Sequence, residues 1–454
     1  MSDRPTRRNL DGWVDPERVV HALGATGDVV WFDRPGGRSL VGWGSEVLRA
    51  SARQAGSLAA AWERVRGTTG PREAGAPLDE PLGWWGLVGY GAGADLLEPG
   101  DATWAGLLGD PVHPDLALLD VDRALVFDET LGTVEAVVRS SAHAWLDDLR
   151  ETWDALRHSI ASSPPSVPEP VPAAAPRLRA EWADTREAYL DAIRRCQETI
   201  ARGDAWVMCL TTSVRVRGVA EPDLEVYGRL RRATGAPRAS FARLGSISYL
   251  GASPETLLTV DADGLLESEP IKGTRPRSVD AALDARIAAE LAADEKERAE
   301  NLMIVDLLRN DLSRVAVPGS IEVAELFAVR SYTQVHQLVS RVRARLRAGL
   351  TGVDAVQAVF PPGSMTGAPK EGVVRMLGLL ESEPRGFYAG AVGRFGSDGT
   401  VDLGVVIRSI VLDRTTGVAR VGVGGGITQG SIPSAEWDEV RLKAEVLLTV
   451  LGAV

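Results

Sequence analysis

A proline-rich segment constrains the fold of this chain more than any other feature of its sequence. Residues 162–176 read Ser-Ser-Pro-Pro-Ser-Val-Pro-Glu-Pro-Val-Pro-Ala-Ala-Ala-Pro. Proline lacks a backbone N–H and its ring clashes with a preceding helical turn, so this run can continue neither a helix nor a central strand. We interpret residues 161–180 as an extended linker. It separates an N-terminal region, residues 1–160, from a larger domain, residues 181–454.

Length and charge limit the classes of function. A chain of 454 residues exceeds the usual size of one hydrophobic core, which favours two domains or one large two-lobed domain. The 50 basic and 62 acidic side chains give a formal net charge of −12, which argues against nucleic acid or an anionic membrane as a partner. A small anionic substrate would therefore need a local group of N–H donors, Arg, Lys or a metal ion.

The sequence is typical of a protein from a reducing compartment. Cys196 and Cys209 provide no disulfide framework. Residues 1–13 contain no apolar core like that of a signal peptide, and no uncharged apolar run reaches membrane-spanning length. We therefore expect a cytoplasmic protein without a membrane partner.

Apolar periodicity predicts strands and helices on both sides of the linker. In the N-terminal region it predicts short strands over 28–32, 117–122 and 124–127, a packed strand in the aromatic and glycine-rich stretch 82–91, and a helix over 144–160. In the larger domain it predicts a helix over 185–202, strands over 206–216 and 246–250, a hairpin over 257–269 and a long helical segment over 281–308. The alternation continues to the end of the chain and indicates a mixed α/β fold.

Residues 360–370 form a run of small residues and hydroxyls enclosed by prolines and followed by a helical pattern from Lys370. Gly363, Ser364 and Thr366 bring backbone N–H groups together just before a helix N-terminus, where they can hold an anion. An ordinary tight turn explains the same residues equally well. The stretch 422–426, with four glycines in five residues, has the same two interpretations: a backbone nest for a carboxylate, or a flexible turn.

Two pairs of glutamates repeat one spacing. Glu297 and Glu300 are three residues apart in a helical segment, and Glu436 and Glu439 repeat this arrangement near the C-terminus. Each pair faces one way on its helix, and alone it is typical of a solvated surface. Four carboxylates at one place would need a cation, and oxygen-only ligation suits Mg²⁺. The five histidines are scattered without metal-ligand spacing, which disfavours zinc.

Lys272 lies in a short segment, residues 270–277, that also contains Thr274, Arg275 and Arg277. A lysine at the end of a strand is usually a solvated charge. Beside a glycine that permits close approach, and with its pKa lowered by burial, it could instead act as a nucleophile.

Together these motifs resemble those of the chorismate-utilising enzymes, which include anthranilate, aminodeoxychorismate, isochorismate and salicylate synthases. Eight motifs stand in the order of that family: SPE at 253–255, PIKGTRPR at 270–277, AENLMIVDLLRND at 299–311, FPPGSMTGAPK at 360–370, GFYAGAVG at 386–393, VVIRS at 405–409, GGGI at 424–427 and ExxExxxKA from 436. The resemblance covers roughly residues 180–450. It implies a large two-lobed fold in which antiparallel-rich sheets form a central β-sandwich with helices outside.

The resemblance also implies roles for individual residues. Mg²⁺ would be bound mainly by Glu300 and Glu439, with Glu297 and Glu436 holding its waters, and would bridge to the ring carboxylate of chorismate. Other residues would contact the substrate: Tyr388 and Arg408 at the pyruvyl side chain, and Gly363, Ser364, Thr366, Gly425 and Lys443 around the carboxylates.

Within the family, the segment around Lys272 resembles aminodeoxychorismate synthase component I, since anthranilate synthases typically carry alanine there. In that branch Lys272 would be the nucleophile, Glu255 the general acid/base, and Thr274 would position the substrate near the leaving hydroxyl. Asn301 also resembles this branch. Val207 stands where the water-adding members carry a lysine, which disfavours isochorismate and salicylate synthesis.

Some features depart from the family. Most members have histidine where Gln337 stands, so either His336 takes over through a change of register or the histidine is dispensable here. The N-terminal region lacks a convincing tryptophan-binding motif, and we predict no inhibition by tryptophan. Neither cysteine lies in a glutaminase motif, so the expected nitrogen source is free ammonia or a separate glutamine amidotransferase subunit.

The predicted activity is thus Mg²⁺-dependent amination of chorismate, for folate or for an aminobenzoate-derived secondary metabolite. Anthranilate or 2-amino-2-deoxyisochorismate synthesis is the alternative within the family. A non-catalytic binding protein that keeps the fold is the alternative from another class, which the intact glutamate pairs, Lys272 and Arg408 disfavour.

Overall fold

The computed structural model of the protein describes residues 5–24, 27–70, 80–97, 102–161 and 178–453. Within these residues every ladder between named strands is antiparallel. The ladders join 20 strands into one connected network.

The strands are β1 (Thr6–Leu10), β2 (Val29–Asp33), β3 (Arg38–Ala50), β4 (Gly83–Val88), β5 (Leu116–Asp128), β6 (Thr133–Val138), β7 (Ala180–Trp182), β8 (Val207–Arg217), β9 (Arg238–Leu244), β10 (Ile247–Ser253), β11 (Thr256–Val260), β12 (Leu265–Glu269), β13 (Ile271–Pro276), β14 (Glu322–Ser331), β15 (Val335–Arg345), β16 (Gly367–Ala368), β17 (Ala391–Gly396), β18 (Val401–Val405), β19 (Ser409–Asp413) and β20 (Val418–Ile427). The α-helices are α1 (Pro16–Leu23), α2 (Ser57–Thr68), α3 (Ala94–Leu97), α4 (Ala102–Leu108), α5 (Trp145–Ala161), α6 (Arg186–Ala201), α7 (Asp223–Thr234), α8 (Ala281–Ala293), α9 (Glu295–Ser313), α10 (Gly352–Val359), α11 (Lys370–Leu380) and α12 (Pro433–Val450). Short 3₁₀ turns cover Tyr90–Gly93, Ser140–Ala142 and Gly363–Met365. No helix in the described part of the chain is both long and apolar enough to cross a bilayer.

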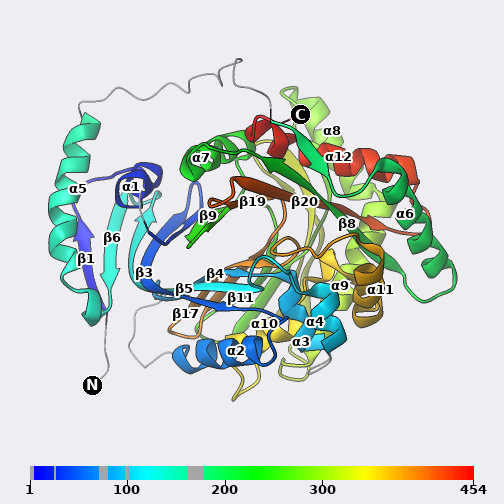
Figure 1. Ribbon diagram of the computed structural model, residues 1–454, viewed down its shortest axis with the longest axis horizontal. Helices are drawn as coiled ribbons and strands as arrows, with labels where there is room; N and C mark the ends of the chain where they lie inside the picture. Colours follow the sequence, from blue (N-terminus) through cyan, green and yellow to red (C-terminus); the bar gives the residue numbers. More distant parts are fainter. Residues whose placement is uncertain (1–4, 25–26, 71–79, 98–101, 162–177, 454) are drawn as a thin grey trace.

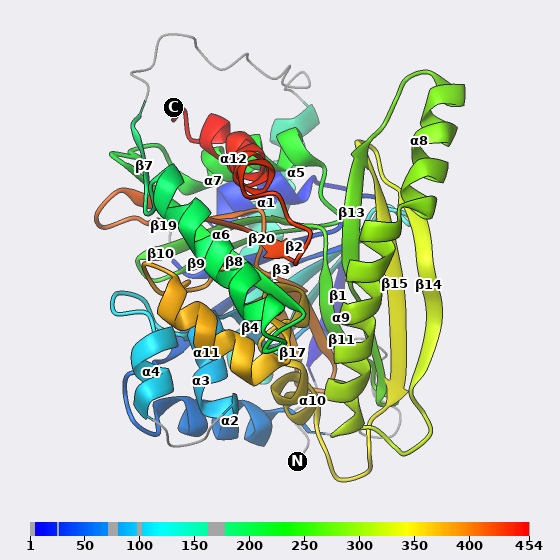
Figure 2. The same cartoon turned by 90° about the vertical axis from the view of Figure 1, so that its right-hand side faces the viewer.

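Three apolar clusters show how the strands and helices are layered. The central cluster, which includes Phe32, Trp85 and Tyr249, draws its buried residues from strands and loops, so it lies between two faces of the folded network. One outer cluster adds residues of α1, α5, α6, α7 and α12, and the other adds residues of α2, α9 and α10. Figures 1 and 2 show these helices outside the strands. The predicted mixed α/β class, with antiparallel-rich sheets in a central β-sandwich, is confirmed.

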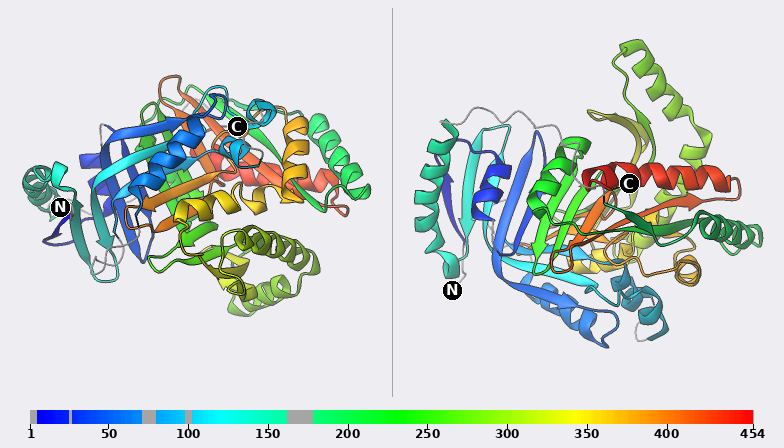
Figure 3. Two further views of the ribbon diagram at one scale, coloured as in Figure 1. Left: turned by 90° about the horizontal axis from the view of Figure 1, so that it is seen from below. Right: turned by 45° about the horizontal axis from the view of Figure 1, so that its top comes forward.

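Strands from both sides of the predicted linker pair with each other. β2 pairs with β9, and β4 pairs with β17, so the N-terminal region shares its hydrogen-bonded network with the larger domain. β1, β6 and α5 lie at one end of the molecule (Figures 1 and 3). The linker falls mainly on residues 162–177, outside the described residues, and the domain boundary stays a prediction.

Two expected elements differ in the structure. The helical segment predicted over 281–308 is two helices, because Asp294 adopts an extended conformation (φ −66°, ψ 111°) between α8 and α9. Its carboxylate accepts a hydrogen bond from the Glu297 N–H at 3.0 Å and so caps α9. The two short strands predicted between 117 and 127 form one strand, β5, which pairs with β3, β4 and β6.

Candidate active site

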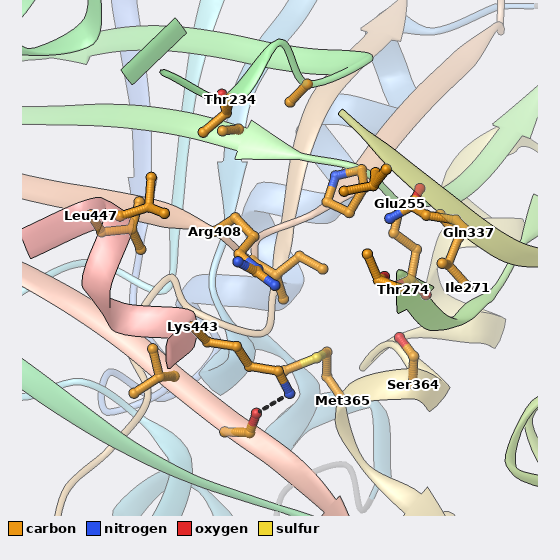
Figure 4. A pocket seen from close by; sticks show the side chains of 18 of the residues that line it. Thr234, Glu255, Ile271, Thr274, Gln337, Ser364, Met365, Arg408, Lys443 and Leu447 are labelled. Atoms are coloured by element: carbon orange, nitrogen blue, oxygen red, sulfur yellow. Dashed lines mark hydrogen bonds between the residues drawn. The ribbon is translucent and has the colours of Figure 1, made fainter. Parts of the chain in front are cut away.

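A cavity of about 420 Å³ lies between β13, β15, β20, α12 and the turn Gly363–Met365. Figure 4 shows side chains from these elements pointing into it. Of the residues predicted to form the site, eight line this cavity: Glu255, Lys272, Thr274, Ser364, Tyr388, Arg408, Gly425 and Lys443. The others lie outside its lining: Glu297, Glu300, Gly363, Thr366, Glu436 and Glu439.

A β-bulge in β13 presents Lys272 and Thr274 to the cavity. Lys272 pairs with Leu338 of β15, and Thr274 pairs with Gln337, so β13 contains one extra residue, Gly273. Gly273 has φ +68°, and a Cβ there would come within 2.8 Å of Leu291 and 3.0 Å of the Glu297 carboxyl carbon. The positive φ and these close neighbours strongly favour glycine at this position. Gly273, the glycine next to Lys272, therefore sets the register between β13 and β15 at the cavity.

Glu255 lies buried on the same side of the cavity, directly before β11. Glu255 is only 6% exposed to solvent. Burial raises the pKa of Glu255 to about 7, although a hydrogen bond with Ser364 and the nearby charge of Lys272 act in the opposite direction. A carboxyl group with this pKa can both donate and accept a proton near neutral pH.

Arg408 and Tyr388 form another part of the lining. Arg408 has φ +52°, which is uncommon for a residue with a Cβ, and its carbonyl accepts a hydrogen bond from the Ala252 N–H at 3.0 Å. Its guanidinium forms no ion pair with any residue that the structure describes, so it is available to an anion. The Tyr388 ring packs on Gly422, where a Cβ would lie 2.1 Å from the Tyr388 Cγ.

The glycines of β20 leave space for charged groups. Lys443 on α12 donates to the Gly424 carbonyl at 2.9 Å and pairs with Glu439 at 2.7 Å. A Cβ on Gly426 would lie 3.8 Å from both the Glu300 Oε2 and the Lys272 Nζ. Both side chains therefore border the space beside Gly426.

The loop at 360–370 has a more structural role than the sequence predicts. Thr366 is fully buried, and its hydroxyl donates to the carbonyls of Pro362 and Gly363, with both distances at 3.2 Å. Gly363 packs against Leu307 of α9. Ser364 and Met365 are loop residues that line the cavity in Figure 4, and Ser364 brings a hydroxyl. The geometry therefore favours a turn held by the Thr366 hydrogen bonds, with the Ser364 hydroxyl facing the cavity, over an anion loop built from Gly363, Ser364 and Thr366.

The predicted glutamates lie around a lysine on α9. Lys296 Nζ is 3.8 Å from a carboxylate oxygen of Glu300 and 3.8 Å from one of Glu436. Glu297 pairs with Arg275 at 3.3 Å. Burial raises the pKa of Glu300; burial also acts on Glu439, but the neighbouring Lys443 holds the pKa of Glu439 below its ordinary value. The sequence analysis did not identify Lys296 as a neighbour of these groups.

The described residues include no group of three or more His, Cys, Asp or Glu side chains placed to hold a metal ion together. The donor set nevertheless suits Mg²⁺, because this ion needs few protein carboxylates and completes its shell with water and substrate oxygens. Glu300, which borders the space beside Lys272, could supply such a ligand.

The structure also shows where Gln337, His336 and Val207 lie, whose roles the motifs did not decide. Gln337 lines the cavity, whereas the His336 ring bonds to Asp284 at 2.9 Å and to Ser331 at 2.8 Å. Neighbouring residues of a strand face opposite ways, so in the observed register His336 points away from the cavity. Val207 begins β8 and pairs with Ala368. Residues 233–237, together with Tyr332, Gln334 and Val335, also line the cavity, and no sequence signal marked them.

Comparisons with known proteins agree with this geometry. Residues 27–449 match the family described as chorismate binding enzyme. The chain is 39% identical to an aminodeoxychorismate synthase from Streptomyces griseus over 96% of this chain and 63% of that protein, and thus spans less than two thirds of its length. It is 35% identical to anthranilate synthase component 1 from Pseudomonas aeruginosa, over 81% of this chain and 75% of that protein.

Solved structures show the same fold. Anthranilate synthase component I from Streptococcus pneumoniae matches with a TM-score of 0.70 and 23% identity, covering 99% of this chain and 93% of that chain. The menaquinone-specific isochorismate synthase MenF from Escherichia coli matches with a TM-score of 0.72 and 19% identity, covering 99% and 94%. From the family match and these relatives, the chain belongs to the chorismate binding enzyme family.

Proposed function

We propose that this protein is the chorismate-aminating component of an aminodeoxychorismate synthase, which converts chorismate and ammonia to 4-amino-4-deoxychorismate and water. One observation carries the proposal: a lysine and a carboxyl group with a pKa near 7 line the same cavity. The likeness to aminodeoxychorismate synthases from Streptomyces griseus and Streptomyces pristinaespiralis, at 39% and 40% identity, supports it.

In the first step Lys272 attacks the chorismate ring. The amine forms a bond to C2, the two conjugated ring double bonds each shift by one position toward C4, and the C4–O bond breaks. Glu255 in its protonated form gives its proton to the departing hydroxyl, which leaves as water. The pKa of about 7 suits this role, because a substantial fraction of Glu255 is protonated at neutral pH.

In the second step ammonia replaces the lysine. A C4–N bond forms, the C2–N bond to Lys272 breaks, and both ring double bonds return to their original places. The Glu255 carboxylate takes back a proton as the new amine loses one, so Lys272 and Glu255 return to their starting states. Free ammonia or a separate glutamine amidotransferase subunit would supply the nitrogen.

The remaining charged groups would hold the two carboxylates of chorismate. Arg408, whose guanidinium faces the cavity, suits the pyruvyl side chain together with Tyr388. Mg²⁺, held by Glu300 and Glu439 with Glu297 and Glu436 behind its waters, would neutralise the ring carboxylate when bound. The backbone around Gly425 and the Ser364 hydroxyl provide donors nearby.

Product analysis tests this proposal. Incubation with chorismate, Mg²⁺ and ammonium at slightly alkaline pH should give 4-amino-4-deoxychorismate. Anthranilate or 2-amino-2-deoxyisochorismate as the main product would instead establish C2 amination, the alternative within the family. Absence of both chorismate binding and turnover would favour a non-catalytic binding protein.

Variants of Lys272 separate the two amination chemistries. Lys272→Ala removes the proposed nucleophile, and Lys272→Arg keeps a positive charge that cannot form the adduct. Both should abolish C4 amination. Retained activity in either variant would contradict covalent catalysis and support direct amination at C2.

A further inference from the structure

Arg385 is a buried cation that the proposed chemistry leaves without a role. It lies between α11 and β17, and its side chain is 2% exposed. Its Nε and Nη2 donate to the two carboxylate oxygens of Glu381 at 2.9 and 2.7 Å. Moving such a pair out of water costs free energy, which the attraction offsets only when the remaining donors are also satisfied. The remaining donors of Arg385 therefore decide what the pair does in the fold.

These donors reach backbone carbonyls at the cavity. The Arg385 Nη1 donates to the Met365 carbonyl at 2.6 Å, and the Nη2 donates to the Cys209 carbonyl at 2.8 Å. Met365 belongs to the turn Gly363–Met365 and Cys209 belongs to β8, and both residues line the cavity. One guanidinium thus joins two parts of the cavity wall that are far apart in the sequence.

Other contacts restrict the orientation of the guanidinium. The ring of Tyr90, from the N-terminal region, covers one face of it, with the Arg385 Cζ 4.2 Å from the ring centroid. The Tyr90 N–H donates to the Gly386 carbonyl at 2.9 Å. Thr211 of β8 donates to the Glu381 Oε1 from its N–H at 3.0 Å and from its hydroxyl at 2.9 Å. Because the ring and the carboxylate are both held, the planar fork of Arg385 is aimed at the turn and at β8.

The turn carries the Ser364 hydroxyl, directly before the residue whose carbonyl Arg385 holds. This hydroxyl is hydrogen-bonded to Glu255, and both residues line the cavity. A short 3₁₀ turn makes few hydrogen bonds of its own, so its orientation depends on the contacts around it. Release of the Met365 carbonyl would therefore let Ser364 move relative to Glu255.

We propose that Arg385 is a positioning residue of the active site. Its guanidinium holds the turn Gly363–Met365 against β8 and thereby keeps the Ser364 hydroxyl beside Glu255, the group that protonates the leaving hydroxyl. Arg385 itself does not line the cavity, so it acts through the turn rather than on the substrate. This inference rests on the proposed function and deepens it, because it explains how the general acid is oriented.

The test is a double-mutant cycle in the full chain, with chorismate, Mg²⁺ and ammonia. Arg385→Lys keeps the positive charge but cannot reach Glu381, Met365 and Cys209 at once. Its kcat should fall about tenfold with a smaller change in KM, because the displaced Ser364 acts on the proton donor and small misplacements of this kind slow the chemical step. In a Ser364→Ala background the same substitution should lower kcat less than about threefold, because the hydroxyl that it would displace is already absent.

Arg243→Lys is the matched control. Arg243 is 4% exposed, donates to both carboxylate oxygens of Asp223 and to the Gly24 carbonyl, and does not line the cavity. Both lysine variants should lower the urea midpoint of unfolding, since each weakens a buried ion pair. Arg243→Lys should nevertheless leave kcat and KM unchanged in both backgrounds when turnover is measured without urea.

The outcomes distinguish this inference from the proposed function. Equal losses of kcat from Arg385→Lys in the two backgrounds, or a lower midpoint with an unchanged kcat, would overturn the positioning role while chorismate turnover stands. Absence of chorismate turnover in the unsubstituted protein would overturn the proposed function, and the inference with it. A loss of kcat that depends on Ser364 supports both.

A second variant keeps the test decisive if Arg385→Lys does not fold. Glu381→Gln retains one acceptor oxygen for the guanidinium and removes the charge that fixes it. It should show the same dependence on Ser364, with a smaller loss of kcat. Equal losses with and without the Ser364 hydroxyl would overturn the positioning role in this variant as well.

Discussion

The strands β13 and β20 border one cavity and contribute to it in opposite ways. β13 brings reactive side chains, Lys272 and Thr274, and uses the single glycine between them to set their register. β20 brings five residues, 422–426, of which four are glycines that line the cavity with backbone. β13 therefore supplies reactive side chains, and β20 leaves space in the cavity. Substitutions in β13 and in β20 should therefore impair the protein for different reasons.

The largest expected effect lies on the chemical side, at Glu255. Glu255→Gln keeps the shape but cannot donate a proton, so kcat for amination should fall roughly 10² to 10⁴-fold. Steady-state kinetics with ammonia measure this, and circular dichroism checks that the fold is kept. Near-normal kcat in this variant would mean that another group protonates the leaving hydroxyl.

The next largest effect lies on the glycine side, at Gly422. A Cβ there would lie 2.1 Å from the Tyr388 Cγ, so Gly422→Ala must displace the ring. We expect a loss of roughly 3 kcal/mol in the free energy of unfolding, together with weaker chorismate binding. Gly430→Ala is the control, because no atom lies within 4 Å of a Cβ at that position. Equal stability of the two variants would contradict the inference that the glycines of β20 are needed to leave space.

The buried carboxyl also predicts a pH dependence of stability. Because burial raises the pKa of Glu255 from 4.5 to about 7, the folded state holds this proton more tightly than the unfolded state does. The resulting stability is fully present below about pH 4.5 and is lost as the pH rises through about 7. Glu255→Gln should therefore gain up to roughly 3 kcal/mol over the unsubstituted protein by pH 8. Denaturant unfolding of both proteins at pH 5 and pH 8 measures the difference, and parallel pH profiles would contradict it.

The smallest effect is expected at Gly426. A Cβ there meets no atom closer than 3.7 Å, so Gly426→Ala should change the free energy of unfolding by less than about 1 kcal/mol. The added methyl group still enters the space shared by Glu300 and Lys272, so kcat/KM should fall a few-fold. A strong loss of stability in this variant would show that β20 needs its glycines for the backbone rather than for space.

The sequence predicted the elements of the site better than their contacts. Helical spacing correctly placed each glutamate pair on a helix, because that pattern depends on neighbouring residues only, but it did not predict that α9 begins at Glu295. The bulge at Gly273 depends on the packing of Leu291, which is distant in sequence. The orientation of Gln337 could therefore not be predicted from the sequence.

Thr366 illustrates the same limit for a side chain. Its type and place in the loop suggested ligand binding, but its hydroxyl bonds within its own turn. A short hydroxyl side chain can satisfy a local carbonyl as readily as a ligand, and only the backbone conformation decides between them.

The pairing of β2 with β9 has a consequence for biosynthesis. Val30 pairs with Ala242, so the edge of β2 leaves the ribosome roughly two hundred residues before its partner strand does. During that interval the N-terminal region exposes unpaired N–H and C=O groups beside apolar side chains, which is the condition that favours edge-to-edge association. Cellular yield should therefore depend on chaperone supply and translation speed more than the stability of the finished protein suggests.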